Sequence, residues 1–190
     1  MVGVMEVRPG GRRRIDRVLA PPFSTGLGTL GLAEVRARRD DAAQEETDLS
    51  YLRRLLHARI DLVRAEQRRR REGGTAPVVD ELARILAENA VGPPTGSGRH
   101  QTLQPSRAEA HRRQVEALIA DVDLSDVGSL SAGQLEGALA AYRAQETSVS
   151  ARRREVQHVV DTLNAEIGSR YASGTASVDE LLAEQRKLAR

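Results

Sequence analysis

Apolar residues recur at helical intervals in two long stretches of the chain, and neither stretch contains a proline. The apolar positions are Leu49, Leu52, Leu56, Ile60 and Val63 in the first stretch, and Val149, Val156, Val160, Leu163 and Ile167 in the second. This spacing places each set on one side of an α-helix. We therefore predict two long helices, over residues 29–72 and 131–171, that pack through these sides as the seam of a short coiled coil.

Glycine and proline divide the rest of the chain into shorter segments. Gly10-Gly11 and Pro21-Pro22 prevent a long helix near the N-terminus, and Gly73-Gly74 end the first long helix. Ser131 and Gln134 have the spacing of a capping box at the start of the second. About 60 residues separate the two helices, enough for the chain to return, so the predicted fold class is all-α, an antiparallel coiled-coil hairpin with short accessory helices. The other predicted segments are a mobile basic arm over 1–28, a short helix over 73–91, a flexible linker over 92–106, a short helix with a connector over 107–130 and a short C-terminal helix over 172–190.

The two long helices look like copies of one another. An offset of 100 residues aligns them without a gap, and the stop after each helix and the start of the next helix also match. The matched residues are Leu30, Glu46, Thr47, Ser50, Arg53, Arg54, Asp61, Ala65 and Glu66, with Leu130, Glu146, Thr147, Ser150, Arg153, Arg154, Asp161, Ala165 and Glu166. Gly74-Thr75-Ala76 matches Gly174-Thr175-Ala176 in the same way. This order indicates the duplication and fusion of one ancestral unit.

A polar stripe runs beside the apolar side of each helix. The stripe positions are Glu46, Ser50, Arg53, His57 and Asp61 on the first helix and Glu146, Ser150, Arg153, Gln157 and Asp161 on the second. At about 100° per residue, each stripe stays within roughly 80° of the helix circumference and is about 22 Å long. Charged residues at this spacing are common on solvated faces. Four of the five positions are nevertheless identical in both copies, which favours a ligand contacted by both helices, on stripes open to solvent in the free protein.

These residue types suit a guanine nucleotide. An Asp carboxylate can accept hydrogen bonds from the N1–H and N2–H groups of guanine, and Arg can bind O6 and N7, stack on the base or pair with a phosphate. Ser and Gln can donate to phosphate or ribose oxygens. The sequence has no glycine-rich phosphate loop, which excludes a P-loop or Rossmann nucleotide site.

Composition narrows the remaining classes of function. The absence of cysteine excludes disulfides, thiolate metal sites and a cysteine nucleophile. The few histidines lack metal-ligand spacing, and no serine lies in a nucleophile elbow, so we expect no metal, no catalytic residues and no enzyme activity. The chain has neither an apolar run long enough to span a bilayer nor a signal-peptide core, so we expect a cytoplasmic protein without a membrane partner.

The pattern E-x3-S-x2-R-x3-Q-x3-D on two long helices resembles the cyclic di-GMP signature of the RsiG anti-sigma factors of actinobacteria. The second copy, from Glu146 to Asp161, fits fully, and the first, from Glu46 to Asp61, has His57 in place of Gln. The resemblance covers about residues 30–190. It implies that the ten stripe residues bind cyclic di-GMP, as two intercalated molecules on an antiparallel coiled coil. It further implies that the protein, so armed, sequesters a WhiG-type sigma factor of the flagellar and sporulation class and blocks transcription of sporulation genes.

A basic structural or nucleic-acid-binding coiled coil without a nucleotide ligand is the alternative. The arginine runs 12–14 and 68–71 favour it slightly. Acidic residues are interleaved with the basic ones, however, the formal net charge is only +2, and aromatic residues make up 2% of the chain. Single-strand binders rely on stacking aromatics. We therefore expect no direct DNA binding.

Overall fold

The computed structural model describes residues 6–73 and 124–175, and every regular element in these ranges is helical. Two helices are long, α2 (Leu32–Arg71) and α5 (Ala132–Ala172). The shorter elements are α1 (Arg14–Val18) and the 3-10 turns η1 (Pro21–Phe23), η2 (Leu27–Thr29) and η3 (Leu124–Ser129). The all-α prediction is confirmed, with α2 and α5 close to the predicted ranges 29–72 and 131–171. The helices predicted over 73–91 and 172–190, the linker over 92–106 and most of the segment 107–130 lie outside the described residues.

The ends of the long helices follow local sequence signals. The Ser131 N–H donates to Gln134 Oε1 at 2.8 Å, and the Gln134 N–H donates to Ser131 Oγ at 3.3 Å, so the predicted capping box forms. Gly73 and Gly174, which follow α2 and α5, have φ of +66° and +72°. This left-handed conformation costs glycine little and terminates a helix.

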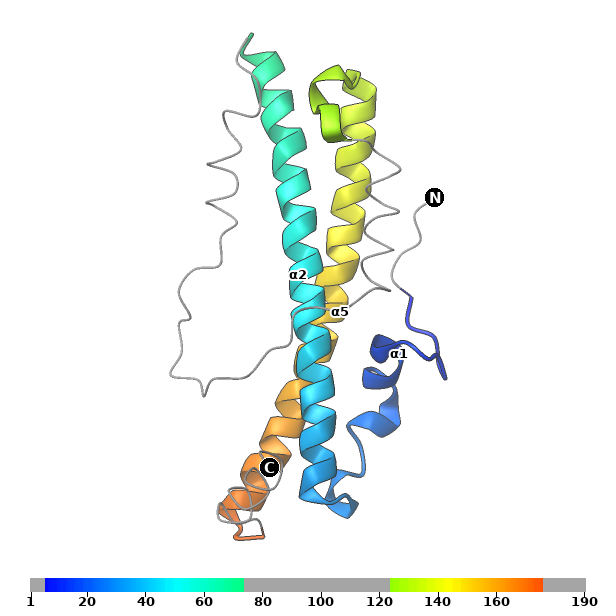
Figure 1. Ribbon diagram of the computed structural model, residues 1–190, viewed down its shortest axis with the longest axis vertical. Coiled ribbons are helices and arrows are strands. Elements are labelled where there is room, and N and C mark those ends of the chain that lie inside the picture. The colour runs from blue at the N-terminus through cyan, green and yellow to red at the C-terminus, as the bar shows by residue number, and fades with distance from the viewer. Residues whose placement is uncertain (1–5, 74–123, 176–190) are drawn as a thin grey trace, which may run out of the picture. The chain divides into compact units, whose positions relative to one another are not determined.

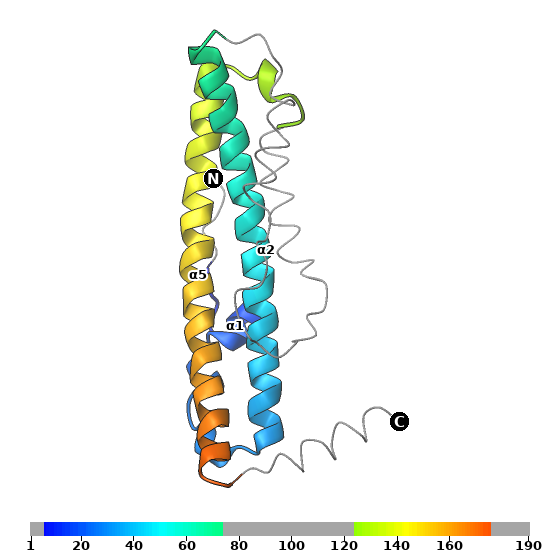
Figure 2. The same ribbon diagram turned by 90° about the vertical axis from the view of Figure 1, so that its left-hand side faces the viewer.

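The chain divides into two compact units, and each long helix contributes to both. The first unit contains Met1–Glu6 and Thr47–Arg153, and the second contains Val7–Glu46 and Arg154–Arg190. Within each unit, the α2 and α5 segments lie side by side and run in opposite directions (Figures 1 and 2). In the first unit, Arg53 contacts Glu146 while Arg70, later in α2, contacts Gly128, which precedes α5. The predicted antiparallel packing is therefore confirmed.

The seam is built largely from the predicted apolar residues. In the first unit, the buried apolar residues of α2 and α5 are Leu49, Leu52, Leu56, Ile60, Val63 and Ala65 with Leu135, Ala138, Leu139, Tyr142 and Val149. In the second unit, Val156, Val159 and Leu163 of α5 are buried. Val160 and Ile167, which the sequence placed in the seam, are only partly buried. Val159 and Val160 both fit three- and four-residue spacing from Val156, so packing rather than periodicity selects Val159.

The N-terminal segment differs from the mobile arm expected over residues 1–28. Ile15 and Val18 of α1 are fully buried in the second unit. Arg17 Nη2 lies 3.0 Å from Asp41 Oδ2 on α2, and Arg14 Nε lies 3.4 Å from the other oxygen of the same carboxylate. The prediction of a mobile arm rested on the average composition of residues 1–28, and this average did not reveal the short amphipathic helix α1.

A sequence signal for this helix exists within the repeat. Residues 12–20 read RRRIDRVLA and residues 112–120 read RRQVEALIA, at the same 100-residue offset that aligns the long helices. The first two arginines, the acidic position and the four apolar positions coincide in the two strings, whereas Arg14 and Arg17 stand opposite Gln114 and Ala117. In sequence, the segment that contains α1 is therefore part of the duplicated pattern.

Asp16 anchors the N-terminal segment from inside. Its carboxylate is 2% exposed and accepts hydrogen bonds from the Arg8 N–H at 2.8 Å and from the Arg13 guanidinium at 2.7 and 2.8 Å. The hydrogen bond from Arg13 lowers the Asp16 pKa to about 2 despite the opposing effect of burial. Gly11 has no room for a side chain, because a Cβ there would lie 2.2 Å from Asp16 Oδ2.

Candidate functional site

Four of the predicted stripe residues meet in the first unit, two from each long helix. The Ser150 hydroxyl donates to Glu146 Oε1 at 2.6 Å. Arg53 Nε donates to Glu146 Oε1 at 3.3 Å and to Ser150 Oγ at 3.1 Å. His57 Nε2 lies 3.3 Å from the same Glu146 oxygen. We call these four residues the polar cluster, in which Glu146 Oε1 accepts hydrogen bonds from both Arg53 and Ser150.

Helix periodicity brings the members of the polar cluster together. Arg53 and His57 are one turn apart on α2, and Glu146 and Ser150 are one turn apart on α5. Each pair lies next to seam residues along its helix, so antiparallel packing turns the two pairs toward each other. The side chains are half-buried, with exposed fractions of 41% for Arg53, 36% for His57 and 20% for Glu146.

The environment of Glu146 keeps its carboxylate charged. Burial acts to raise the Glu146 pKa, but the hydrogen bonds from Ser150 and Arg53 and the nearby charges of His57 and Arg53 act against it, and the pKa is lowered overall. The polar cluster therefore holds an anionic oxygen between an arginine, a hydroxyl and an imidazole. Each of these three groups can also serve a phosphate or a carbonyl oxygen.

The other six stripe residues are divided equally between the two units. Ser50, Asp61 and Arg153 belong to the first unit, where Asp61 Oδ1 lies 3.5 Å from Arg64 Nη1 on the same helix. Glu46, Gln157 and Asp161 belong to the second unit. Gln157 and Asp161 are exposed, whereas the other eight stripe residues are partly buried. The stripes are thus less open than the sequence suggested, because side chains of neighbouring helices cover one another.

Sequence reasoning missed two arginines that hold the ends of the long helices. Arg70 pairs with Glu66 at the end of α2, and Arg170 pairs with Glu166 at the end of α5. The offset of 100 residues had already matched the two glutamates. It matches the two arginines as well, so the same comparison could have found them.

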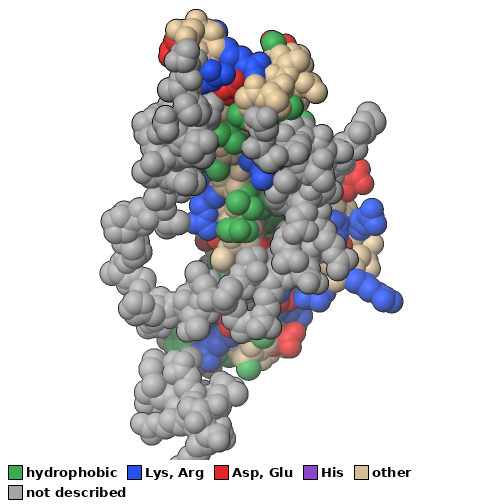
Figure 3. All heavy atoms as spheres, turned by 45° about the horizontal axis from the view of Figure 1, so that its top comes forward, with side chains coloured by type: hydrophobic (Ala, Val, Ile, Leu, Met, Phe, Trp, Pro, Cys, Tyr) green, Lys and Arg blue, Asp and Glu red, His purple; other side chains and the backbone are tan. Residues whose placement is uncertain are grey.

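The described residues carry mixed charge on the one face that Figure 3 displays. Figure 3 shows basic and acidic side chains next to one another on the displayed face. Such a distribution lacks the one-sign stripe that backbone binding to nucleic acid uses. Within residues 6–73 and 124–175, no helix is long and apolar enough to cross a membrane.

Comparison with protein families gives one match that spans most of the chain. The model of the RsiG-like family matches residues 21–86 and 121–185. The two matched segments begin 100 positions apart, which is the offset that aligns the long helices. They contain all ten stripe residues and exclude α1. No curated protein matches the chain.

Proposed function

The chain belongs to the RsiG-like family of anti-sigma factors, and we propose that it restrains a WhiG-type sigma factor when its polar stripes hold cyclic di-GMP. The observation that carries this proposal is the polar cluster, in which Arg53 and His57 of one motif copy face Glu146 and Ser150 of the other. A ligand seated there touches both copies at once.

The chemistry of the stripes supports a two-fold symmetric guanine nucleotide. Asp61 and Asp161 offer carboxylate oxygens for the N1–H and N2–H groups of guanine, and Asp161 is exposed. Arg53 and Arg153 can offset phosphodiester charge or stack on a base. Motif copies related by a fixed offset match a ligand with two equivalent halves, and two such ligands would use the ten stripe residues.

The ligand would act on the partner by stiffening the two helices. Nucleotides that bridge α2 and α5 fix their relative position, and a fixed surface costs a partner less entropy to bind. Linkage then requires the sigma factor to raise cyclic di-GMP affinity by the same factor by which the ligand raises sigma-factor affinity. For a switch that needs both signals, we expect a factor of about 100.

Calorimetric titration of cyclic di-GMP into the full chain, with and without a WhiG-type sigma factor, tests this function. We expect tighter binding in the presence of the sigma factor, and weaker binding for Arg53→Ala. The exposed Arg143, outside both motifs, provides the matched control variant Arg143→Ala. Equal affinities with and without the sigma factor would remove the switch. Salt-dependent binding of duplex DNA, with no cyclic di-GMP binding, would instead establish the nucleic-acid alternative.

A further inference from the structure

A hydrogen bond connects the last turn of α2 to the 3-10 turn η3, which precedes α5. Arg70 Nε donates to Glu66 Oε1 at 2.6 Å, and Arg70 Nη2 donates to the Gly128 carbonyl oxygen at 3.1 Å. Glu66 has no exposed surface and also accepts from Arg69 Nε at 2.7 Å. We call Glu66, Arg70 and the Gly128 carbonyl the first clasp, and all of it lies in the first unit.

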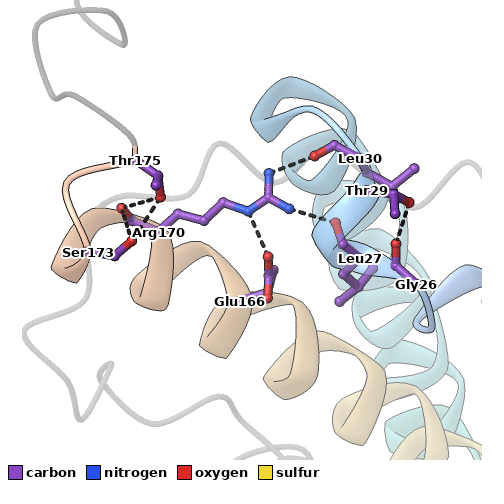
Figure 4. A network of polar contacts seen from close by, with 8 residues as sticks. All are labelled: Gly26, Leu27, Thr29, Leu30, Glu166, Arg170, Ser173 and Thr175. Carbon is purple, nitrogen blue, oxygen red and sulfur yellow. Dashed lines mark hydrogen bonds and ion pairs between the residues drawn. The ribbon is translucent and has the colours of Figure 1, made fainter.

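Hydrogen bonds from an arginine likewise connect the last turn of α5 to the turn that precedes α2. Arg170 Nε donates to Glu166 Oε1 at 2.7 Å, and its two terminal nitrogens donate to the carbonyl oxygens of Leu30 at 2.8 Å and Leu27 at 2.6 Å (Figure 4). These residues form the second clasp, which lies in the second unit. Ser173 and Thr175 hydroxyls donate to the Arg170 carbonyl oxygen and hold the last turn of the helix closed.

The two clasps share their glutamate and arginine, whereas the carbonyl acceptors are Gly128 in the first and Leu27 and Leu30 in the second. Glu66 and Arg70 match Glu166 and Arg170 at the offset of 100 residues, and the turns that supply the carbonyls share Gly28 with Gly128 and Leu30 with Leu130. In both clasps, an arginine in the last turn of one long helix reaches the turn before the other long helix. The device thus joins opposite halves of the duplicated chain.

Arginine is suited to this pair of contacts because its guanidinium group is planar and carries several N–H donors in fixed directions. One nitrogen can bind the carboxylate four residues earlier while another points at a carbonyl oxygen, with both hydrogen bonds in fixed directions. A lysine ammonium lacks this planar fork geometry. The carboxylate holds the guanidinium in place. Gly128 lies in η3 and Leu27 in η2, whereas Leu30 directly follows η2. The Leu27 carbonyl oxygen accepts from the Leu30 N–H as well as from Arg170, as a carbonyl oxygen with two lone pairs can.

We propose that each clasp is a positioning device that sets the register of the antiparallel helix segments in its own unit, and that the first clasp so holds Arg53 and His57 opposite Glu146 and Ser150. Coiled-coil seams of apolar residues specify register weakly, and polar contacts often fix it. A slip of one residue moves a side chain by about 1.5 Å and turns it by about 100°, enough to break the polar cluster. The effect on register stands by itself, whereas the effect on ligand affinity rests on the proposed function.

Pulsed electron-spin distance measurements on the full chain test the register. The chain has no cysteine, so Tyr51→Cys and Ala144→Cys place two spin labels at exposed positions of α2 and α5 in the first unit without a background signal. In this background, Arg70→Met should broaden or shift the distance distribution while helical circular dichroism stays unchanged. Arg70→Lys should behave like Arg70→Met. The adjacent and exposed Arg71 provides the control, since Arg71→Met should leave the distribution as in the parent.

Two further measurements keep the outcome decisive. Arg70→Met leaves Arg69 on Glu66, and if helicity nevertheless falls, Glu66→Gln with Arg70→Met removes the buried charge and should show the same broadening. An unchanged distribution in helical Arg70 variants, or full rescue by Arg70→Lys, overturns the proposal. Cyclic di-GMP affinity of Arg70→Met should fall by about ten-fold, as expected when one contact to the ligand is misplaced. If the parent protein does not bind cyclic di-GMP while the register shift occurs, the proposed function fails and the positioning role stands.

Discussion

Each of the two compact units contains a buried carboxylate, and the two carboxylates have different structural roles. In the first unit, Glu66 is fully buried and is held by Arg69 and Arg70 of its own helix, within a segment that matches the RsiG-like family. In the second unit, Asp16 is buried within the N-terminal segment, before the family match begins, and is held by Arg13 and the Arg8 backbone. The first carboxylate stabilises the helical pair that carries the polar cluster, whereas the second organises the N-terminal segment within its own unit. Buried charge at comparable depth can therefore serve either the shared architecture or a local attachment.

The largest effect should come from removing the partners of Glu66. Arg69→Met combined with Arg70→Met leaves a carboxylate with no exposed surface unpaired, and breaking such a buried pair costs about 3–5 kcal/mol. Urea unfolding at neutral pH measures this loss. Arg170→Met in the second unit is the comparison, and it should cost less because Glu166 remains 27% exposed and can be solvated. Equal losses for the two variants would contradict the assigned difference in burial.

Acid should remove the contributions of both carboxylates. The hydrogen bond from Arg69 lowers the Glu66 pKa to about 2, and the one from Arg13 lowers the Asp16 pKa to about 2. A lowered pKa in the folded state stabilises the protein above the unfolded-state pKa, and this stability is lost as the pH falls from about 4.5 toward 2. The shifts correspond to about 3 kcal/mol for Glu66 and about 2 kcal/mol for Asp16.

Unfolding free energies measured from pH 7 down to pH 2 check this dependence. Glu66→Gln and Asp16→Asn should each flatten the acid limb of the curve. A parent protein whose stability does not change below pH 4.5 would contradict the assigned pKa values.

The two motif aspartates should respond alike although they lie in different units. Asp61→Ala and Asp161→Ala each remove a carboxylate acceptor for guanine, and loss of a charged hydrogen-bond partner costs about 1.5–3 kcal/mol, roughly ten- to hundred-fold in affinity. Isothermal titration with cyclic di-GMP measures the loss, and circular dichroism shows whether helicity is kept. Full affinity in both variants would assign the stripes to a solvated surface.

The smallest effect should come from the exposed ion pairs of α1. Asp41→Asn removes a partner of Arg14 and Arg17, but the Asp41 side chain is 37% exposed and that of Arg17 is 54% exposed. Exposed pairs contribute about 0–1 kcal/mol and weaken with salt. Thermal unfolding at low and high salt should therefore show a small difference that disappears at high salt. Ile15→Ala is the comparison, and it should cost more, about 2–5 kcal/mol, because Ile15 is fully buried.

The sequence was enough to name the residues of the polar cluster, but it did not predict which of them would contact one another. The motif spacing identified Arg53, His57, Glu146 and Ser150, and the structure places the other three around Glu146. The spacing did not predict that the Glu146 carboxylate would accept hydrogen bonds both from a residue of its own helix and from a residue of the other long helix. That contact joins residues 93 positions apart and depends on the register of two helices.

The sequence by itself determined the elements of this protein. The two long helices, their capping and stop signals and the duplicated stripes all depend on interactions within a few residues, which a helical period records directly. The tertiary structure alone decided which of Val159 and Val160 enters the seam and that α1 docks on α2. It also decided that Arg170 reaches the Leu30 carbonyl across 140 residues. Such contacts follow from how two helical surfaces settle against each other, where a shift of one residue changes every partner, and no local pattern encodes that choice.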